Sequence, residues 1–316
     1  STKVVNNGGS ATGSNLNLVI QKNEQGTGKV IVGAEFALYS VSNGQKGQLL
    51  RTGTTDSNGQ INWENLKSGN YILVETQAPD GYIISPTLAA GKQITLSESS
   101  AADNDTVADV ETNQQGSVTL KKTDSSTGNQ LDGAVFSLYE KDGTLVKSGL
   151  TTENGELSYS GLNAGDYYFV ETSAPAGYHF DPNKQYAFTL DSDNISATVN
   201  VSNDENSVVL TKTDSNSSDN NPVQGATYSI YTSDGTEVAS GLTTDANGQI
   251  EYQNKDLAAG DYYFVETDSP DGYQLSTKHY DFTVSDNQQA TVHVNSSDQE
   301  NSVTLTKTDG SANGVV

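Results

Sequence analysis

Short runs in which apolar and polar residues alternate recur along the whole chain. Examples are VTL at 118–120, FSLY at 136–139, YAFTL at 186–190 and ATVNV at 197–201. A period of two is the pattern of a half-buried β-strand. Turn sequences such as KDGT and SDGT separate the runs, and no stretch shows apolar spacing of three and four over a dozen residues. The chain is therefore predicted to be all-β.

The chain repeats one order of motifs three times. The most similar segments are YILVETQAPDGY at 71–82, YYFVETSAPAGY at 167–178 and YYFVETDSPDGY at 262–273. Each follows a strand that opens with Gly-Ala and, before that, a strand that ends near a lysine. These lysines are Lys22, Lys122, Lys212 and, in a fourth and incomplete copy, Lys307. Their period of about 95 residues indicates tandem units and not one large domain.

The period predicts where the units begin and end. Residues 1–13 are a linker or the end of a preceding repeat, residues 14–114, 115–204 and 205–300 are three repeats, and residues 301–316 are the first strand of a truncated fourth. Six or seven short strands in about 90 residues predict a small antiparallel, immunoglobulin-like β-sandwich. Because the joints are short, we expect a linear array of sandwiches and a chain that is a monomeric rod.

Composition and charge exclude several classes of function. The chain has no cysteine, so it has no disulfide, thiolate metal site or cysteine nucleophile. Its net charge of −24 argues against binding to nucleic acid or to an anionic membrane, because both require a basic face. No apolar run is long enough for a membrane helix, so no membrane insertion is expected. The sequence shows no signal peptide or wall-anchor motif, and we expect both outside this fragment of a longer chain.

Alternation of side chains places the lysine of each repeat on the apolar face of its first strand. Lys122 shares parity with Val118 and Leu120, and the same holds for Lys22 and Lys212 in their own strands. A lysine at such a position either extends its ammonium into water past the end of the strand or is buried. The sequence of one strand leaves both readings open.

The same argument applies to one glutamate in each repeat, and the last strand of each repeat ends with a polar residue nine positions before the next lysine. The glutamates are Glu75, Glu171 and Glu266, and the polar residues are Asn113, Asn203 and Asp298. Glu171, for example, shares parity with Tyr167 and Phe169. Polar residues at strand ends are common, because they satisfy backbone groups. An inward Lys, an inward Glu and a terminal Asn or Asp, repeated three times in the same order, favour a shared site instead.

These residue types together support one reaction. Burial lowers the pKa of a lysine amine and raises that of a carboxyl, so a buried pair can hold a neutral amine beside a protonated acid. The amine can attack the side-chain carbonyl of Asn or Asp, while the Glu polarises that carbonyl and carries protons to the departing ammonia or water. Fixed geometry supplies effective molarities of roughly 10⁵–10⁸ M. The product is an isopeptide bond made once, so we predict no enzyme with turnover.

The motifs resemble those of a known family. The opening VTLKKTD, the Gly-Ala strand and the segment Y-x-x-V-E-T-x-[AS]-P-x-G-Y are similar to tandem Cna B-type (prealbumin-like) domains of Gram-positive surface adhesins and pilin backbones, where the last motif is called the E-box. The resemblance covers residues 14–316. It implies self-formed isopeptide bonds Lys22–Asn113, Lys122–Asn203 and Lys212–Asp298, promoted in turn by Glu75, Glu171 and Glu266.

Two repeats depart from this pattern. In the first repeat, Asn-Glu follows the lysine where the others have Thr-Asp, and Asn113 shares parity with Asp109 and Glu111, which suit a core face poorly. Whether the bond forms in the first repeat is therefore left open. In the third repeat, Asn295 is a rival acceptor to Asp298 if the last strand carries a bulge.

The resemblance implies the stalk of an extracellular, cell-wall-anchored adhesin or pilus, whose host or surface ligand binds outside this fragment. One alternative is repeats that bind a matrix protein or a glycan themselves, for which the first repeat, with Trp63 and its extra loop, is the best candidate. The other is accessory modules of a secreted enzyme. No cofactor or metal site is predicted, because GTGK at 26–29 lacks the rest of a phosphate loop and the histidines show no ligand spacing. Calcium binding by the loops is left open.

Overall fold

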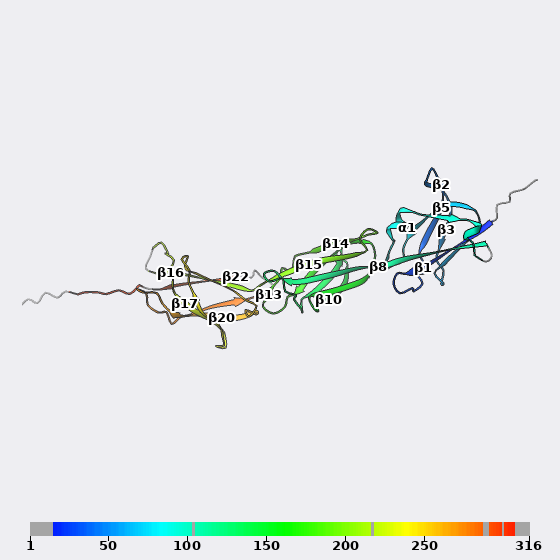
Figure 1. The fold of residues 1–316 in the computed structure, drawn as a ribbon. Helices are drawn as coiled ribbons and strands as arrows, with labels where there is room; N and C mark the ends of the chain where they lie inside the picture. The colour runs from blue at the N-terminus through cyan, green and yellow to red at the C-terminus, as the bar shows by residue number, and fades with distance from the viewer. Residues whose placement is uncertain (1–14, 103–104, 216–217, 287–290, 299, 307–316) are drawn as a thin grey trace, which may run out of the picture.

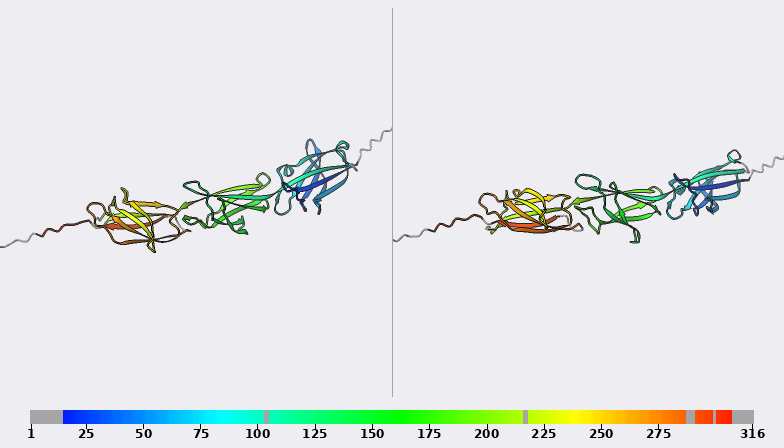
Figure 2. Two further views of the ribbon diagram at one scale, coloured as in Figure 1. Left: turned by 60° about the horizontal axis from the view of Figure 1, so that its bottom comes forward. Right: turned by 90° about the horizontal axis from the view of Figure 1, so that it is seen from below.

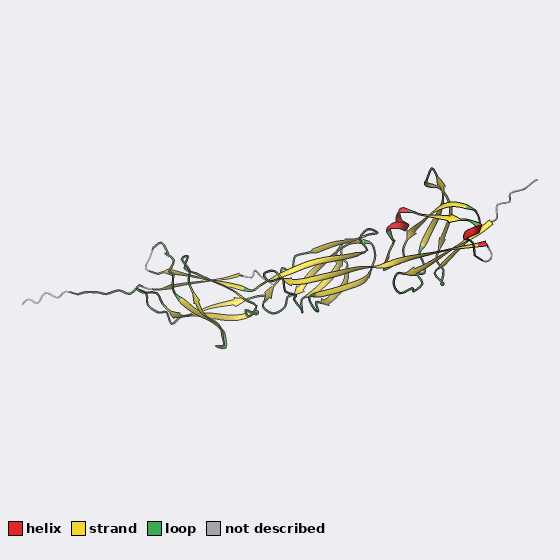
Figure 3. Ribbon diagram, viewed as in Figure 1, coloured by secondary structure: helices red, strands yellow, loops and turns green. Residues whose placement is uncertain are grey.

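The computed structural model describes residues 15–102, 105–215, 218–286, 291–298 and 300–306, without the side chains of residues 291–298. In these residues the chain forms three β-sandwiches that follow one another along a rod (Figure 1). Two further views show the same extended arrangement (Figure 2). Nearly all of the regular structure is strand, and two short helices lie in the first sandwich (Figure 3). The prediction of tandem all-β sandwiches in a linear array is confirmed.

The strands follow the same order in each sandwich. The first unit contains β1 (Asn15–Glu24), β2 (Glu35–Ser42), β3 (Gln45–Thr54), β4 (Gln60–Lys67), β5 (Gly69–Gln77), β6 (Tyr82–Ile83), β7 (Lys92–Leu96) and the start of β8 (Thr106–Asp124). The second contains the rest of β8, β9 (Val135–Glu140), β10 (Leu145–Thr151), β11 (Glu156–Leu162), β12 (Gly165–Ser173), β13 (Tyr178–His179), β14 (Tyr186–Leu190) and β15 (Ser196–Glu205). The third contains β16 (Ser207–Asp214), β17 (Thr227–Thr232), β18 (Glu237–Thr243), β19 (Gln249–Gln253), β20 (Gly260–Asp268), β21 (His279–Val284) and β22 (Thr291–Asp298).

Each unit packs a sheet containing its first and last strands against a four-stranded sheet. In the first unit, the order β4-β1-β8 faces β3-β2-β5-β7. In the second, β11-β8-β15 faces β10-β9-β12-β14, and in the third β19-β16-β22 faces β18-β17-β20-β21. The apolar residues of alternating parity fill the space between the sheets, so each unit has its own core.

The first and last strands of each unit pair in parallel, whereas the other strand pairs are antiparallel. These parallel pairs are β1 with β8, β8 with β15, and β16 with β22. Parallel pairing means that the chain enters a unit at one end and leaves it at the other, which produces a rod. It also brings the end of the first strand beside the end of the last strand, where the sequence places Lys and Asn or Asp.

The joint between the first two units is a strand and not a loop. Strand β8 closes the first unit and opens the second without interruption, and the boundary expected after residue 114 falls inside it. Gly116 lies near its middle, and a Cβ atom there would come 2.1 Å from the carbonyl oxygen of Leu162. The glycine therefore allows β11 to approach the strand at the point where it passes between units.

Strand β6 of the first unit also contributes to the second. It pairs with β8 at Gln114 and Gln115, and Ile83 packs into the core of the second unit beside Val118 and Leu162. The amide of Gly81 donates to Asn163 Oδ1 at 2.6 Å. The two units therefore share hydrophobic as well as backbone contacts.

Between β6 and β8, the first unit contains a helix and a 3₁₀ turn. Helix α1 (Pro86–Ala90) begins after Ser85, whose side chain accepts from the Leu88 amide, and Pro86 occupies the first turn. Leu88 is buried in the first core. The 3₁₀ turn η1 spans Glu98–Ser100.

The first strand of a fourth repeat was expected at residues 301–316, and the described part of this segment is not a strand. Residues 301–306 have no strand assignment, and Val303 and Leu305 are exposed. A first strand is held by a fourth and a last strand on its two sides, and no described strand pairs with residues 301–306. The expected linker at 1–13 and Lys307 lie outside the described residues.

Candidate cross-linking site

Each sandwich buries one lysine against one glutamate between its two sheets. The Nζ–Oε distances are 2.9 Å for Lys22–Glu75, 3.6 Å for Lys122–Glu171 and 2.9 Å for Lys212–Glu266. All six side chains are 0% exposed. Of the two readings that the sequence leaves open for the lysines, burial is therefore the correct one.

Two loops explain why the lysine does not reach water. The Lys22 amide donates to the Gly59 carbonyl, and the Lys22 carbonyl accepts from the Ile31 amide. The same two contacts recur around Lys122 and Lys212. These loops close the end of the sandwich beyond the lysine, so its ammonium stays between the sheets. An unpaired charge there would be costly, and the facing glutamate compensates it.

The predicted acceptor completes the site in the first two units. Asn113 Nδ2 donates to Glu75 Oε1 at 2.6 Å, and Asn203 Nδ2 donates to Glu171 Oε1 at 2.7 Å. Each glutamate therefore contacts the lysine with one oxygen and the asparagine with the other. Asn113 and Asn203 are both buried. The structure brings together the three residue types that the sequence patterns selected.

In the third unit, only the backbone of the acceptor strand is described. Strand β22 pairs with β16 without a register shift, and Asp298 lies opposite Asp214. Asn113 and Asn203 lie opposite the equivalent residues, Glu24 and Asp124. The side chains of Asp298 and of its rival Asn295 lie outside the described residues.

The third lysine and glutamate have further partners. Lys212 Nζ donates to the Tyr228 hydroxyl at 3.1 Å, and the Ser276 amide donates to Glu266 Oε2 at 2.8 Å. Tyr228 occupies the position of Phe36 in the first unit, and these rings lie 5.5 Å and 5.3 Å from the lysine Nζ atoms. An aromatic ring therefore forms part of the wall around the lysine. The recurring aromatic residue after Gly-Ala is the sequence signal that could have identified it.

Burial dominates the electrostatics of the pairs. It lowers the pKa of Lys22 and raises that of Glu75, although each partner opposes the shift in the other. In the second unit, burial raises the pKa of Glu171 and lowers that of Lys122 to about 8. Among the described residues, Lys122 Nζ has no hydrogen-bond partner. Both shifts favour the neutral forms of the amine and the acid.

The acidic residues that suit the core of the first unit poorly have a partner that sequence analysis missed. Lys92 Nζ lies 2.8 Å from Asp109 Oδ1 and 2.5 Å from Glu111 Oε1. Lys92 is on β7 in the facing sheet, so this cluster also bridges the two sheets. No pattern within β7 marks Lys92 as the partner, because the contact depends on how the sheets pack.

A second missed contact lies at the joints between units. The Tyr82 hydroxyl donates to Glu24 at 3.0 Å, and the Tyr178 hydroxyl donates to Asp124 at 2.9 Å. Each acid is two residues after the buried lysine, and each tyrosine ends an E-box. The Asn-Glu sequence in the first repeat therefore keeps the acid that this contact needs. A comparison of the repeats by the charge at this position, and not by the residue type, could have found this contact.

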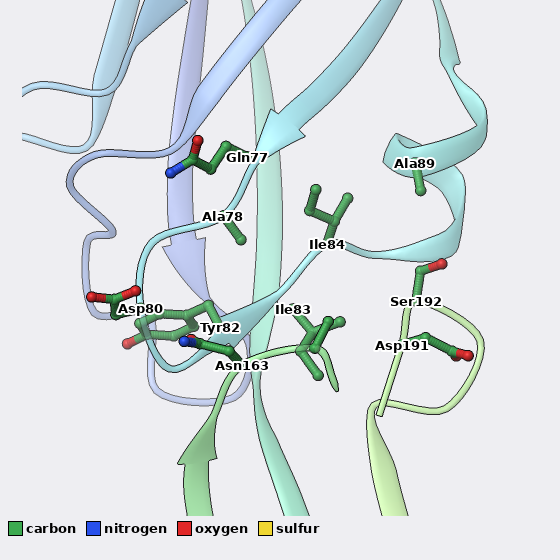
Figure 4. A pocket seen from close by; sticks show the side chains of 11 residues that line it. Gln77, Ala78, Asp80, Tyr82, Ile83, Ile84, Ala89, Asn163, Asp191 and Ser192 are labelled. Carbon is green, nitrogen blue, oxygen red and sulfur yellow. The ribbon is translucent and has the colours of Figure 1, made fainter. Parts of the chain in front are cut away.

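A cleft of about 430 Å³ lies at the joint between the first two units (Figure 4). Ile83 and Ile84 enter it from the first unit, and Asn163 and Asp191 line it from the second. Its walls hold no residue of the Lys–Glu–Asn sites. The cleft is therefore separate from the candidate cross-linking sites.

Other candidate sites are not supported by the described residues. Trp63 is buried in the first core, and its indole N–H donates to the Thr52 carbonyl, so it packs and offers no exposed surface for a sugar. The ligand-binding alternative thereby loses one of the two features that favoured it, and the extra loop of the first repeat remains. No described group of three His, Asp or Glu side chains is arranged to hold a metal ion. Within the same residues, no helix is long and apolar enough to cross a membrane.

Comparison with curated proteins gives two kinds of relatives. Serine-aspartate repeat-containing protein D of Staphylococcus aureus strain Newman is 27% identical over 273 residues, covering 72% of this chain and 20% of that protein. The collagen adhesin of Staphylococcus aureus is 35% identical over 94 residues, covering 28% of this chain and 8% of that protein. The chain thus spans about a fifth or less of the length of these relatives.

Similar solved structures include the Bacillus anthracis TIE protein, at 25% identity and a TM-score of 0.45, covering 91% of this chain and 51% of that one. BcpA, the major pilin subunit of Bacillus cereus, is 18% identical with a TM-score of 0.34, covering 91% and 100%. The family model of the SpaA prealbumin-like fold domain matches residues 16–109, 116–205 and 206–299. These three matches cover most of the sequence, and the chain therefore belongs to the family of SpaA prealbumin-like fold domains, of which it contains three in tandem.

Proposed function

We propose that the chain is a load-bearing stalk of an extracellular adhesin or pilus, in which each unit cross-links itself through an isopeptide bond. The observation that supports this most strongly is the fully buried glutamate that contacts both lysine and asparagine. In the first unit, Glu75 lies 2.9 Å from Lys22 Nζ and 2.6 Å from Asn113 Nδ2. The second unit repeats this arrangement.

The chemistry follows from this arrangement. Transfer of a proton from the Lys22 ammonium to Glu75 leaves a neutral amine beside a protonated acid. The amine nitrogen attacks Cγ of Asn113, the bond from Cγ to Nδ2 breaks, and Glu75 relays a proton to Nδ2, which leaves as ammonia. The attacking nitrogen loses a proton to Glu75 as Nδ2 gains one from it, so Glu75 is protonated both before and after the amine attacks, and no oxidant or cofactor is consumed. With Asp298 as acceptor in the third unit, water leaves instead of ammonia.

The position of the bond explains its mechanical value. Each bond joins the end of a first strand to the end of a last strand, and these strands run in parallel. Tension entering at the start of β1 therefore passes through Lys22 and Asn113 into the second half of β8, and most of the first sandwich lies outside this path. The closed loop also restricts the unfolded chain, which stabilises each unit by roughly 4–5 kcal/mol.

Mass spectrometry of the intact chain tests the proposal. The expected mass is lower than that of the sequence by two ammonias and one water. Replacing Glu171 with Gln keeps the shape of the side chain but removes the acid, and should restore one ammonia. Glu156→Gln is a matched control, because Glu156 forms an exposed pair with Lys121 at 3.4 Å. A full sequence mass, with Lys22 and Lys122 recovered in unmodified peptides, would refute the proposal.

A further inference from the structure

The wall of the first site differs from the walls of the other two. On the strand beside the E-box strand, Lys92 pairs with Leu73, Tyr186 with Phe169, and Tyr280 with Phe264. Leu73, Phe169 and Phe264 each lie two residues before the buried glutamate. Lys92 therefore occupies the position that a tyrosine occupies in the second and third units.

The last strand changes in the same way. Asp109 and Glu111 pair with Ile20 and Lys22 in the first unit. In the second unit, Val199 and Val201 pair with the equivalent residues, Leu120 and Lys122. Three apolar or aromatic wall residues of the second unit, Tyr186, Val199 and Val201, are thus replaced together by a lysine and two acids. Since the three replacements contact one another, they form one structural unit.

This polar wall lies directly beside the reacting lysine. Glu111 is the register partner of Lys22 on the adjacent strand, and only 9% of its surface is exposed. The charged groups close to Glu111 are Lys92 from β7, Asp109 from its own strand, and Lys22 from β1, which itself pairs with Glu75. Lys92 compensates only one of the two acids.

We propose that Glu111 is a positioning residue that controls the proton on Lys22. As a result, the first unit cross-links more slowly than the second at neutral pH, and its cross-linking becomes faster in mild acid. This inference rests on the proposed function and extends it. It assigns a distinct rate and pH dependence to one of the three bonds.

The direction of the pH effect on the first bond follows from the charges near Lys22. The reactive state needs a neutral Lys22, and the negative charges of Glu111 and Asp109 stabilise its ammonium. With both acids ionised, the cluster with Lys92 carries a net charge of −1, and protonation of Glu111 makes it neutral. Burial and the hydrogen bond with Asp109 raise the pKa of Glu111 to about 7. The charge that retards the reaction is therefore lost as the pH falls through about 7.

The second unit has no group that titrates in the same way at these positions. Val199 and Val201 carry no charge, and burial raises the pKa of Tyr186 to about 12. The second bond therefore serves as an internal reference within each molecule. An effect of pH on folding that is common to both units cancels in the ratio of their rates, whereas the effect of Glu111 on Lys22 changes that ratio.

The test measures both bonds in one full-length chain. Protein recovered unfolded in urea is refolded by dilution at pH values from 5.5 to 8.5, stopped at intervals with denaturant, and digested. Mass spectrometry then follows the peptides linked through Lys22 and through Lys122. At pH 8 the first bond should form at least about tenfold more slowly than the second, which corresponds to one pKa unit on Lys22. The ratio of the two rates of bond formation should approach one at pH 5.5.

Three variants separate this role from simple packing. Glu111→Gln should accelerate the first bond at pH 8 and remove its pH dependence relative to the second bond. The triple variant Lys92→Tyr, Asp109→Val and Glu111→Val should give the same result, because it reproduces the wall of the second unit. Glu64→Gln, at an exposed position on β4, should change neither rate.

Equal rates for the two bonds across this pH range, or a ratio unchanged by Glu111→Gln, would overturn the inference while leaving the cross-links intact. Absence of any linked peptide in every unit would overturn the proposed function together with the inference. The two failures are therefore distinguishable in one data set.

Discussion

Asn113 and Lys122 lie on the same strand, β8, one at the end of the first sandwich and the other at the buried site of the second. Nine residues separate them, which is about 30 Å of strand. If both residues are cross-linked, the connection between the two bonds is a single extended strand. A tether already at full length cannot lengthen much under load, so force passes directly from one bond to the next.

Pulling single molecules from both ends should therefore give no unfolding steps from the first two units of the native chain. With the proposed bonds in place, most of each unit lies between the joined residues, and tension cannot reach it without breaking a covalent bond. In the variant Glu75→Gln, the first unit should unfold and add roughly 300 Å of contour length, since about 90 residues become free to extend. Atomic force spectroscopy measures this increment.

The control for this experiment is the exposed variant Glu156→Gln, which should behave like the native chain. If the native chain showed steps of the length expected for a whole unit, the load would pass through the sandwiches and the mechanical role would be wrong.

Ile83 connects the stability of the second unit to the first. Its side chain is 2% exposed and belongs to the core of the second unit, although β6 follows the E-box of the first. Ile83→Ala should destabilise the second unit by about 2–4 kcal/mol, because it removes buried methyl groups and leaves a cavity. Hydrogen exchange along β8 and β11 should locate this loss.

Val32→Ala is a suitable comparison for Ile83→Ala, since Val32 is an exposed apolar residue. It should change hydrogen exchange in neither unit. A loss of protection confined to the first unit in Ile83→Ala would show that the shared core does not couple the two units.

Strand parity identified the lysines and glutamates because a period of two fixes which face a side chain occupies. The repeat period identified Asn113 and Asn203, each nine residues before the next lysine. Neither signal needed knowledge of which strands pair. Parity could not find Lys92, because its contact with Glu111 depends on how two sheets pack. It also could not show that β8 passes from one unit into the next, since Gly116 resembles a break in the alternation.

The first unit should be less stable at pH 8 than at pH 5. Glu111 has a pKa raised from 4.5 to about 7 by burial and by its contact with Asp109. A carboxyl whose pKa is raised on folding contributes stability that is fully present below pH 4.5 and is lost as the pH rises through about 7. Thermal unfolding of the variant Asn113→Ala, which cannot form the first bond, measures this without the cross-link.

Adding Glu111→Gln to Asn113→Ala should remove most of the difference between pH 5 and pH 8. Glu75 also has a raised pKa and titrates in the same direction, so a smaller dependence should persist. An unchanged pH dependence in the double variant would show that Glu111 is not its source.

The backbone register predicts which residue accepts the bond in the third unit. Asp298 lies opposite Asp214, as Asn113 and Asn203 lie opposite the acids that follow their lysines, whereas Asn295 lies opposite Thr211. No register shift separates the two positions on β22, so Asn295 has the other parity. The third unit should therefore lose water and not ammonia.

Two variants decide between these acceptors. Asp298→Ala should restore the mass of one water to the intact chain and leave the peptide of Lys212 unmodified. Asn295→Ala should leave the linked peptide and the mass deficit of the third unit unchanged, because Asn295 and Asp298 have opposite parity in the backbone register of β22. Loss of a third ammonia from the native chain, abolished by Asn295→Ala, would show instead that the strand shifts its register when the bond forms.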